Sequence, residues 1–376
     1  MGGSEMVVVW NGRPVRAWRP EPLSALALDL PVDVARSTER AAAGVRRVGD
    51  RLPAGSEPLA RLLLRAEGTA SSNIEGLRAP VAAVATAELD AGAASDSAAW
   101  VADNLAVVTD ALDAARSGGA LTERELHRWH TRLMRHGGLD ADLVGAFRTL
   151  QGWIGGRGPH DAAYVPPPPD FVPDLMGDLI AFTGRTDIDP VTQAAVAHAQ
   201  FETIHPYADG NGRLGRLLVL WLLARRAAVA VPPPVSVLVA RDPGGYLAGL
   251  YWFRTGELAR WVSWFAGVVE ASAGAAIEWA GELEALLADW RGRVGDLRSD
   301  AAARAVLELL PAHPVLSAGL VVERVGVSDT AARVALKALV ARGVLEPYAA
   351  AASGPGRPRR WWVAGELVDL VGGWAG

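Results

Sequence analysis

Apolar residues recur along most of this chain at spacings of three and four, which predicts a mainly helical protein. Such stripes occupy residues 59–66, 126–134, 214–222 and 261–290. Asp189 followed by Pro190 is typical of a helix start, and Pro206 ends the helix that begins there. The stretch from Val32 to Arg116 is also predicted to be helical, with breaks at Pro53, Gly68, Gly76 and Pro80.

Two places interrupt the helical pattern with short β-prone runs. Met6 to Val15 is predicted to form a strand or an extended arm. Residues 151–156 and 164–167 lie on either side of a Gly- and Pro-rich loop, and both are β-prone. Such a pair predicts a hairpin.

The last part of the chain has a different pattern. Helices are predicted over Ala301–Leu310, over Leu316–Val325 and from Ser328 to Arg342, with strand-like pieces at 344–346 and 360–363. This order is typical of a winged helix-turn-helix. We therefore predict three parts, which are an N-terminal helical region (1–117), a helical core (118–298) and a winged-helix domain (299–376).

Charge gives the winged-helix domain a candidate partner. Residues 301–364 carry eight basic and four acidic side chains, although the whole chain has a net charge of −5. A duplex-binding face is therefore predicted on the third helix and the wing. Winged helices also serve as protein-docking modules, so DNA and a protein both remain candidate partners. The residues predicted to contact DNA are Arg333, Lys337, Arg357, Arg359 and Arg360.

Composition excludes several kinds of chemistry. The 376-residue chain has no cysteine, which rules out disulfides, thiolate catalysis and zinc–thiolate sites. Residues 1–19 lack the sustained apolar core of a signal peptide. The apolar run 217–224 is far shorter than the ~20 residues needed to span a bilayer. We expect a cytoplasmic protein with no membrane partner.

Residues 205–216 bring together several side chains that could bind or react with a ligand. They read His-Pro-Tyr-Ala-Asp-Gly-Asn-Gly-Arg-Leu-Gly-Arg. Glycines at the start of the following helix let backbone N–H groups converge on one point, as in phosphate-binding sites. Arg213 and Arg216 lie three apart and can reach the same anion. Asp209 can bind a Mg²⁺ that bridges phosphates. His205, with a pKa near neutrality, is the candidate general base.

This stretch resembles the signature of the Fic family, His-x-Phe-x-Asp/Glu-Gly-Asn-Gly-Arg-x-x-Arg, with Tyr207 in place of the usual phenylalanine. The resemblance implies a Fic-type helical bundle that transfers AMP from Mg²⁺-ATP to a Ser, Thr or Tyr hydroxyl of a target protein. His205 would be the base and Asp209 the metal ligand. The implied ATP-binding residues are Gly210, Asn211, Gly212, Arg213, Arg216 and Tyr246.

Residues 71–76 are similar to the inhibitory motif of the family, Ser/Thr-x-x-x-Glu-Gly/Asn. The resemblance implies that Glu75 pairs with Arg216 and blocks the position of the γ-phosphate, so that the enzyme is autoinhibited. Ser71, Glu75 and Gly76 are the matching positions. An ordinary capped helix end would give the same short pattern.

The predicted hairpin corresponds to the flap of Fic proteins, whose edge pairs with a segment of the target protein. The implied docking residues are Gln151, Trp153 and Ile154. The overall expectation is a mostly α protein, in which a Fic-type bundle with a short flap precedes a winged helix.

Other functions remain open from the sequence. A hydrolase that removes AMP from proteins would use Glu75 to position water. A DNA-binding regulator would keep the Fic core only as a nucleotide sensor, although the intact His205 argues against a sensor. A phosphotransferase variant of the family carries lysine where this chain has Gly212, which disfavours it. The target protein, the choice of nucleotide and the presence of a homodimer are not fixed by the sequence.

Overall fold

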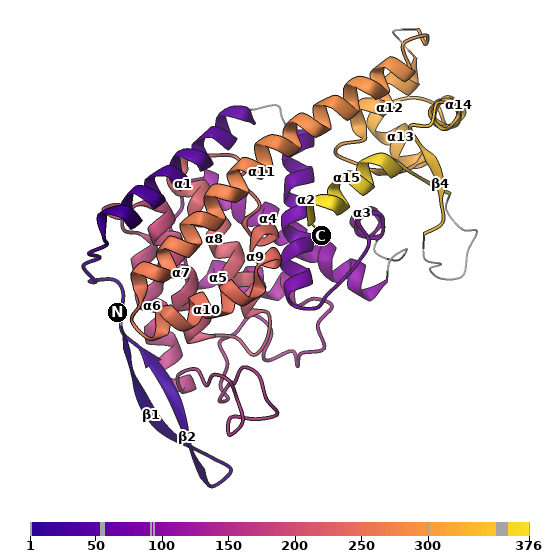
Figure 1. Ribbon diagram of the computed structural model, residues 1–376. Helices are drawn as coiled ribbons and strands as arrows, with labels where there is room; N and C mark the ends of the chain where they lie inside the picture. Colours follow the sequence, from indigo (N-terminus) through magenta and orange to yellow (C-terminus); the bar gives the residue numbers. More distant parts are fainter. Residues whose placement is uncertain are drawn as a thin grey trace. The chain divides into compact units, whose positions relative to one another are not determined.

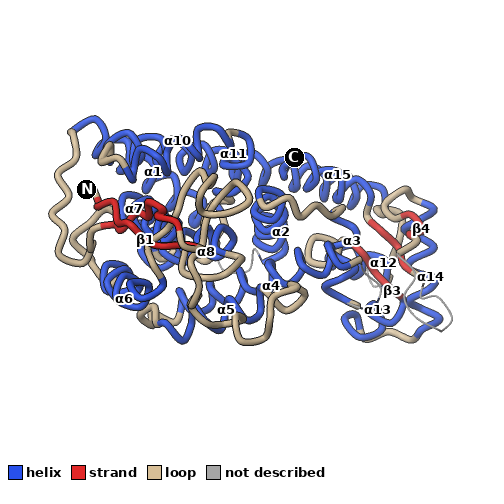
Figure 2. The backbone as a smooth tube through the Cα atoms, turned by 90° about the horizontal axis from the view of Figure 1, so that it is seen from below, coloured by secondary structure: helices blue, strands red, loops and turns tan. Residues whose placement is uncertain are grey.

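The computed structural model describes residues 2–52, 57–90, 92, 95–298, 301–350 and 360–375. These residues are mostly helical, as the apolar spacing predicts (Figure 1). Their strands form one N-terminal hairpin and one small three-stranded sheet (Figure 2). The chain divides into two compact units, one of residues 1–50 and 107–273 and the other of residues 51–106 and 274–376. None of the described helices has the length and apolarity needed to cross a membrane.

The first unit is a helical bundle preceded by a β-hairpin. Strands β1 (Gly3–Trp10) and β2 (Arg13–Pro20) pair antiparallel around Asn11 and Gly12, which both have positive φ, as two-residue hairpin turns require. Its helices, together with parts of α4 (Asp96–Arg116) and α11 (Leu258–Arg293), are α1 (Val32–Arg51), α5 (Glu123–Leu133), α6 (Val172–Thr183), α7 (Pro190–Ile204), α8 (Asn211–Ala227), α9 (Val235–Arg241) and α10 (Pro243–Arg254).

Helices α7 and α8 form the centre of this unit. Every residue of α7 from Val191 to Ile204 is buried, and α7 packs along α8. The Asp189 carboxylate accepts hydrogen bonds from the backbone N–H groups of the first turn of α7, which confirms the predicted cap. A Cβ at Gly215 would displace the Glu202 carboxylate and lie 3.1 Å from the Phe201 ring, so glycine favours this close approach. The loop between the two helices is therefore held at both ends by a tight helix pair.

The second unit combines helices from both halves of the chain with the small sheet. Residues from α12 through α15 are called the C-terminal module below. The sheet has the order β3-β5-β4 and is antiparallel throughout. Besides parts of α4 and α11, the elements are α2 (Glu57–Ile74), α3 (Val81–Leu89), α12 (Ala302–Leu309), β3 (Val315–Ser317), α13 (Ala318–Val325), α14 (Asp329–Ala341), β4 (Glu346–Tyr348), β5 (Trp361–Val363) and α15 (Gly365–Ala375).

Three details differ from the sequence-based expectation. Helix α2 runs through Gly68 without a break, because this glycine lets α4 approach; a Cβ there would lie 3.0 Å from the Leu105 Cγ. The predicted hairpin at 151–167 is a single antiparallel bridge between Ile154 and Tyr164. Helix α15 was not anticipated, and tertiary contacts support it, since Trp374 stacks on Trp279 with ring centroids 5.1 Å apart.

Candidate active site

The candidate site begins where α7 ends. His205 takes a left-handed conformation (φ 50°, ψ 61°), and its N–H donates to the Phe201 carbonyl at 2.8 Å. Gly210 also has positive φ and directly precedes α8. A left-handed conformation is uncommon for a residue other than glycine and costs free energy, so the surrounding structure must hold it. Residues 205–210, called the motif loop below, thus have their backbone fixed at both ends.

Asn211 shapes the motif loop from inside. Its Oδ1 accepts from the Tyr207 N–H at 2.9 Å, and its Nδ2 donates to the Tyr207 carbonyl at 2.8 Å. Both functions of the amide are therefore used within the loop. The groups that this region offers to an anion are the backbone N–H groups of the first turn of α8.

The tyrosine that replaces the usual phenylalanine has a partner for its hydroxyl. Tyr207 is fully buried, and its ring stacks on His130 with centroids 4.1 Å apart. Its hydroxyl lies 3.0 Å from Nδ1 of His127, whose Nε2 lies 3.2 Å from the Glu123 carboxylate. Burial raises the pKa of Tyr207 well above its usual value, so the side chain stays a neutral phenol. Helix α5 therefore provides a hydrogen-bond partner for the hydroxyl that distinguishes Tyr207 from the usual phenylalanine.

His130 holds the other end of the motif loop. Its Nδ1 accepts from the Gly145 N–H at 2.9 Å, so its proton is on Nε2, which lies 3.0 Å from the Asp209 carbonyl. Burial lowers the pKa of His130 to about 4, and the ring is therefore neutral at physiological pH. Sequence reasoning missed this role; the available signal was two histidines three residues apart on one helix face.

Arg148 was also missed as a site residue. Its Nε donates to the His205 carbonyl at 2.8 Å, and its terminal nitrogens donate to the carbonyls of Ile204, Leu150 and Pro167. Its own N–H donates to the Pro206 carbonyl at 2.8 Å. Burial lowers the pKa of this guanidinium to about 10, which leaves it charged. The buried Arg148 thus joins the end of α7 to the segments at Leu150 and Pro167.

A cavity of about 240 Å³ brings the candidate base next to the predicted docking segment. His205 lines this cavity together with Gln151 and Trp153. The His205 side chain is 22% exposed, and its Nδ1 lies 3.9 Å from the Glu202 carboxylate. Residues 151–166, called the flap below, are held by the pairing of Ile154 with Tyr164. A hydroxyl that enters this cavity can therefore meet the imidazole.

The flap is supported by the N-terminal hairpin. The Trp18 N–H of β2 donates to the Val165 carbonyl at 2.9 Å. The rings of Trp10 and Trp153 lie 5.8 Å apart. The flap, whose outer edge contains Gln151 to Ile154, therefore packs against the N-terminal hairpin.

Cationic and anionic groups flank the start of α8. Arg213 and Arg216 are both buried in its first turns, and Arg213 Nη2 lies 3.5 Å from the Met134 sulfur. Asp209 is exposed, and its Oδ1 accepts from the Gly210 N–H at 2.7 Å. The described residues contain no group of three side chains that would hold a metal by themselves. Mg²⁺ bound through nucleotide phosphates needs only one or two protein carboxylates, so Asp209 fits that mode.

Comparisons with known proteins agree with this geometry. Residues 120–223 match the model of the Fic/DOC family. The chain carries a Fic domain. It is 31% identical over 146 residues to the protein adenylyltransferase fic-1 of Caenorhabditis elegans, a match that covers 38% of this chain and 26% of that protein. It is 35% identical over 120 residues to the protein adenylyltransferase Fic of Drosophila willistoni, covering 31% and 22%. The chain thus spans about a quarter of the length of these relatives.

A solved structure shows the same fold over most of the chain. A Fic family protein from Desulfovibrio desulfuricans G20 matches 90% of this chain and 98% of that chain, with a TM-score of 0.56 and 21% identity. At this identity the match concerns the fold alone. The Fic domain therefore lies within a longer shared fold.

Tyr246, the residue expected near the nucleotide base, lies in the core of the first unit. Its ring is buried, and its hydroxyl is 3.0 Å from Nε2 of His198. Burial, with a smaller contribution from Arg216, lowers the pKa of His198 to about 3. On the same helix, Tyr251 is 58% exposed and lines a cavity of about 550 Å³ between β2, the flap and α10.

The predicted inhibitory segment forms the capped end of α2. The Gly76 N–H donates to Asn73 O and the Leu77 N–H donates to Ser72 O, with Gly76 at positive φ, which is a Schellman motif. Glu75 is the cap residue of this helix. Ser72 and Asn104 bind each other and the Gly68 carbonyl. Glu75 lies in the second unit and Arg216 of the Fic motif in the first, and their pairing stays a prediction.

The residues predicted to contact DNA lie in the C-terminal module. Arg333 and Lys337 are exposed on α14, and Arg333 pairs with Asp329 at 2.7 Å. Arg360 is exposed at the start of β5. Arg357 and Arg359 lie outside the described residues.

Replacing Arg148 by lysine tests how the Fic motif loop is held. Lysine keeps the charge but cannot reach four carbonyls at once. We expect the variant to unfold at lower urea concentration, with a loss of roughly 1.5–3 kcal/mol for each charged hydrogen bond removed. Arg157→Lys is the matched control, because Arg157 is an exposed flap residue. Equal unfolding free energies for both variants would contradict the assigned role.

Proposed function

We propose that the protein is an adenylyltransferase that moves AMP from ATP to a hydroxyl of a target protein. The observation that carries this proposal is the cavity shared by His205 and the flap residues Gln151 and Trp153. In this proposal His205 is the base, and the flap surface beside it binds an extended peptide of the target. The names of the curated relatives support the same activity.

The chemistry needs few protein groups. His205 accepts the proton of a Ser, Thr or Tyr hydroxyl, and the oxygen then bonds to the α-phosphorus of ATP. The bond from that phosphorus to the oxygen bridging the α- and β-phosphates breaks, and pyrophosphate leaves. Such transfer depends mainly on position and on charge stabilisation.

The start of α8 is the proposed phosphate site. Backbone N–H groups from Gly210 to Gly212 and the guanidinium groups of Arg213 and Arg216 would bind the phosphates. Asp209 would hold Mg²⁺, which neutralises phosphate charge when bound. Asn211 would act through the loop that it shapes, since its amide is bound to Tyr207. Tyr246 would support the nucleotide site from the core.

The flap is the proposed docking edge for the target. Gln151 donates from Nε2 to the Pro166 carbonyl at 2.8 Å, which keeps the edge extended. Trp153 is 38% exposed and can contact the target side chains. Added strands bind mainly through backbone hydrogen bonds, so this mode tolerates different target sequences.

Glu75 is the proposed inhibitor of the transferase. The Schellman motif fixes the backbone of Glu75 at the end of α2, and Ser71, one turn earlier, is buried. In the inhibited state Glu75 would pair with Arg216 and occupy the place of the γ-phosphate, so that ATP cannot align its α-phosphorus. The same carboxylate would position water if the enzyme also removes AMP.

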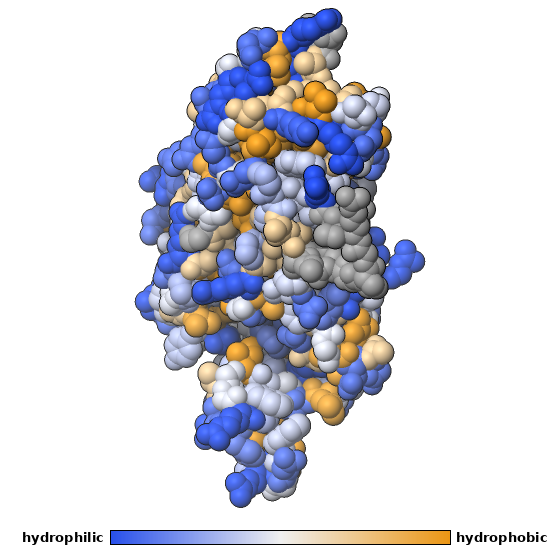
Figure 3. All heavy atoms as spheres, turned by 90° about the vertical axis from the view of Figure 1, so that its right-hand side faces the viewer, coloured by the Kyte–Doolittle hydropathy of each residue, from blue (hydrophilic) through white to orange (hydrophobic). Residues whose placement is uncertain are grey.

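The C-terminal module is proposed to be a winged helix that binds duplex DNA in the cytoplasm. Its order of helix, strand, two helices and two strands supports this assignment. The exposed face of α14 carries Arg333, Val334 and Lys337, which combines cations with one apolar contact group. The surface drawn in Figure 3 is mostly hydrophilic, with hydrophobic residues in small patches.

His205→Ala tests the transferase directly. Loss of a general base typically costs about 10²–10⁴-fold in rate. We expect incorporation of label from α-labelled ATP into the protein to fall by that factor, while binding of Mg²⁺-ATP persists. His136→Ala is the control, because this histidine is exposed and lies outside the motif. Labelling of His205→Ala at the wild-type rate would sink the assignment.

Glu75→Gly tests the inhibition. Removing the carboxylate frees Arg216 for the γ-phosphate, so labelling should rise strongly above wild type. Glycine at a helix end costs no more than roughly 1 kcal/mol, which the unit should tolerate. Adding Arg216→Ala should remove much of the gain. Equal labelling of wild type and Glu75→Gly would mean that Glu75 is only a helix cap.

A further inference from the structure

One buried guanidinium joins three parts of the second unit. Arg65 of α2 is 4% exposed. It donates to the Glu88 carboxylate of α3 at 2.9 Å and to the Ala312 carbonyl at 2.8 Å, with Pro311 O at 3.4 Å. Residues 311 and 312 link α12 to β3. A buried cation is costly unless its donors are satisfied, so α2, α3 and the C-terminal module depend on one another at this point.

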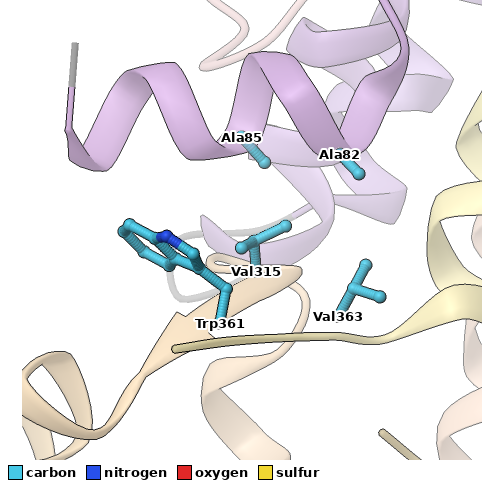
Figure 4. Close-up of a cluster of buried hydrophobic side chains, with 5 residues drawn as sticks. All are labelled: Ala82, Ala85, Val315, Trp361 and Val363. Atoms are coloured by element: carbon cyan, nitrogen blue, oxygen red, sulfur yellow. The ribbon is translucent and has the colours of Figure 1, made fainter. Parts of the chain in front are cut away.

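Apolar packing reinforces the same connection. Ala82 and Ala85 of α3 point toward Val315, Trp361 and Val363 of the sheet, as Figure 4 shows, and all five side chains are buried. Helix α15 packs along both α2 and α3. The C-terminal module and helix α2, which ends directly before Glu75, therefore form one packed body.

A short stretch of helix α2 separates Arg65 from Glu75. Glu75 follows ten residues later along α2, which corresponds to about 15 Å of helix. The end of α2 is bound to α4 through the hydrogen bonds of Asn104 to Gly68 and Ser72. A continuous helix thus connects Arg65 to Ile74, the residue that directly precedes Glu75.

Glu88, which binds Arg65, lines a polar groove of about 990 Å³. The groove lies between the end of α3 and the C-terminal module. Its charged lining residues are Glu88, Glu323, Arg324, Arg333 and Arg360. The Glu88 side chain is 30% exposed, so the carboxylate that binds Arg65 is also open to a ligand in the groove.

The charges of the groove favour a polyanion. Glu323 lies 3.6 Å from Arg324, Arg333 pairs with Asp329 at 2.7 Å, and Glu88 is held by Arg65. Among the described residues, Arg360 of the groove and Lys337, four residues after Arg333 on α14, have no carboxylate partner. Phosphates of a duplex backbone can pair with these cations in series, whereas an acidic peptide offers fewer charges at fixed spacing.

We propose that duplex DNA bound in this groove releases the inhibition by Glu75. A phosphate placed among Arg324, Arg333 and Arg360 repels the Glu88 carboxylate and weakens its bond to Arg65. Helix α2 then loses one of its attachments to the module, and Glu75 shifts from its inhibitory position. DNA favours the released state because only that state lacks the repulsion. This inference rests on the proposed role of Glu75.

The test uses the full chain with a short mixed-sequence duplex at low salt. Labelling from α-labelled ATP should rise roughly 5–150-fold in wild type, the range of typical allosteric coupling. Glu75→Gly should be highly labelled without DNA and gain nothing from it. Independently of activity, DNA should speed amide hydrogen exchange in residues 65–76.

Glu88→Gln separates this mechanism from DNA binding alone. The amide still accepts from Arg65 but removes the repelled charge, so DNA should bind and activation should fall. Glu308→Gln is the control, because Glu308 is exposed on α12 and pairs with Arg291 outside the groove. Full activation of Glu88→Gln would overturn the role given to this carboxylate.

Three other outcomes are decisive. DNA that binds wild type but changes neither labelling nor exchange contradicts the coupling, provided that Glu75→Gly is active. Absence of binding in gel shifts overturns DNA as the ligand and leaves a protein as the occupant. If Glu75→Gly is not activated but exchange in residues 65–76 still responds to DNA, the coupling stands and the proposed inhibition fails.

Discussion

The close packing of α7 on α8 is the constraint on which the site depends. Gly215 permits the approach, and the six residues between the helices must then turn sharply, with His205 and Gly210 at positive φ. Three side chains hold that turn: Asn211 from inside, His130 from α5 and Arg148 from the flap side. The proposed base and the proposed phosphate-binding start of α8 are thereby fixed before any ligand binds, which is how electrostatic catalysis lowers its reorganisation cost.

Buried arginines serve two different purposes in this protein. Arg148 and Arg65 are surrounded by carbonyl groups, with one carboxylate on Arg65, and they join segments that are distant in sequence. Arg213 and Arg216 lie in the first turns of α8, where the helix dipole and the backbone N–H groups already favour an anion. The first pair stabilises the fold, and the second pair suits phosphate.

The sequence predicted those features that are local. The cap at Asp189, the helical stripe at residues 261–290 and the motif itself depend on neighbouring residues. It missed His130 and Arg148, because the motif-loop carbonyls that they bind lie 57 and 79 residues away along the chain. It also placed a break at Gly68, where the reason for glycine is contact with Leu105 of another helix. The sequence showed Tyr207 in place of the usual phenylalanine, but the partner of its hydroxyl, His127, depends on the packing of α5.

The central claim is that the protein transfers AMP, and the most direct test is to identify which phosphorus of ATP becomes bound to the protein. Purified Glu75→Gly protein would be incubated with Mg²⁺ and ATP labelled either at the α- or at the γ-phosphorus, and the protein would be analysed for bound label and mass. The account predicts label from α-labelled ATP alone, a mass increase of one AMP, and release of pyrophosphate. Label from γ-labelled ATP would show phosphoryl transfer instead and would contradict the account.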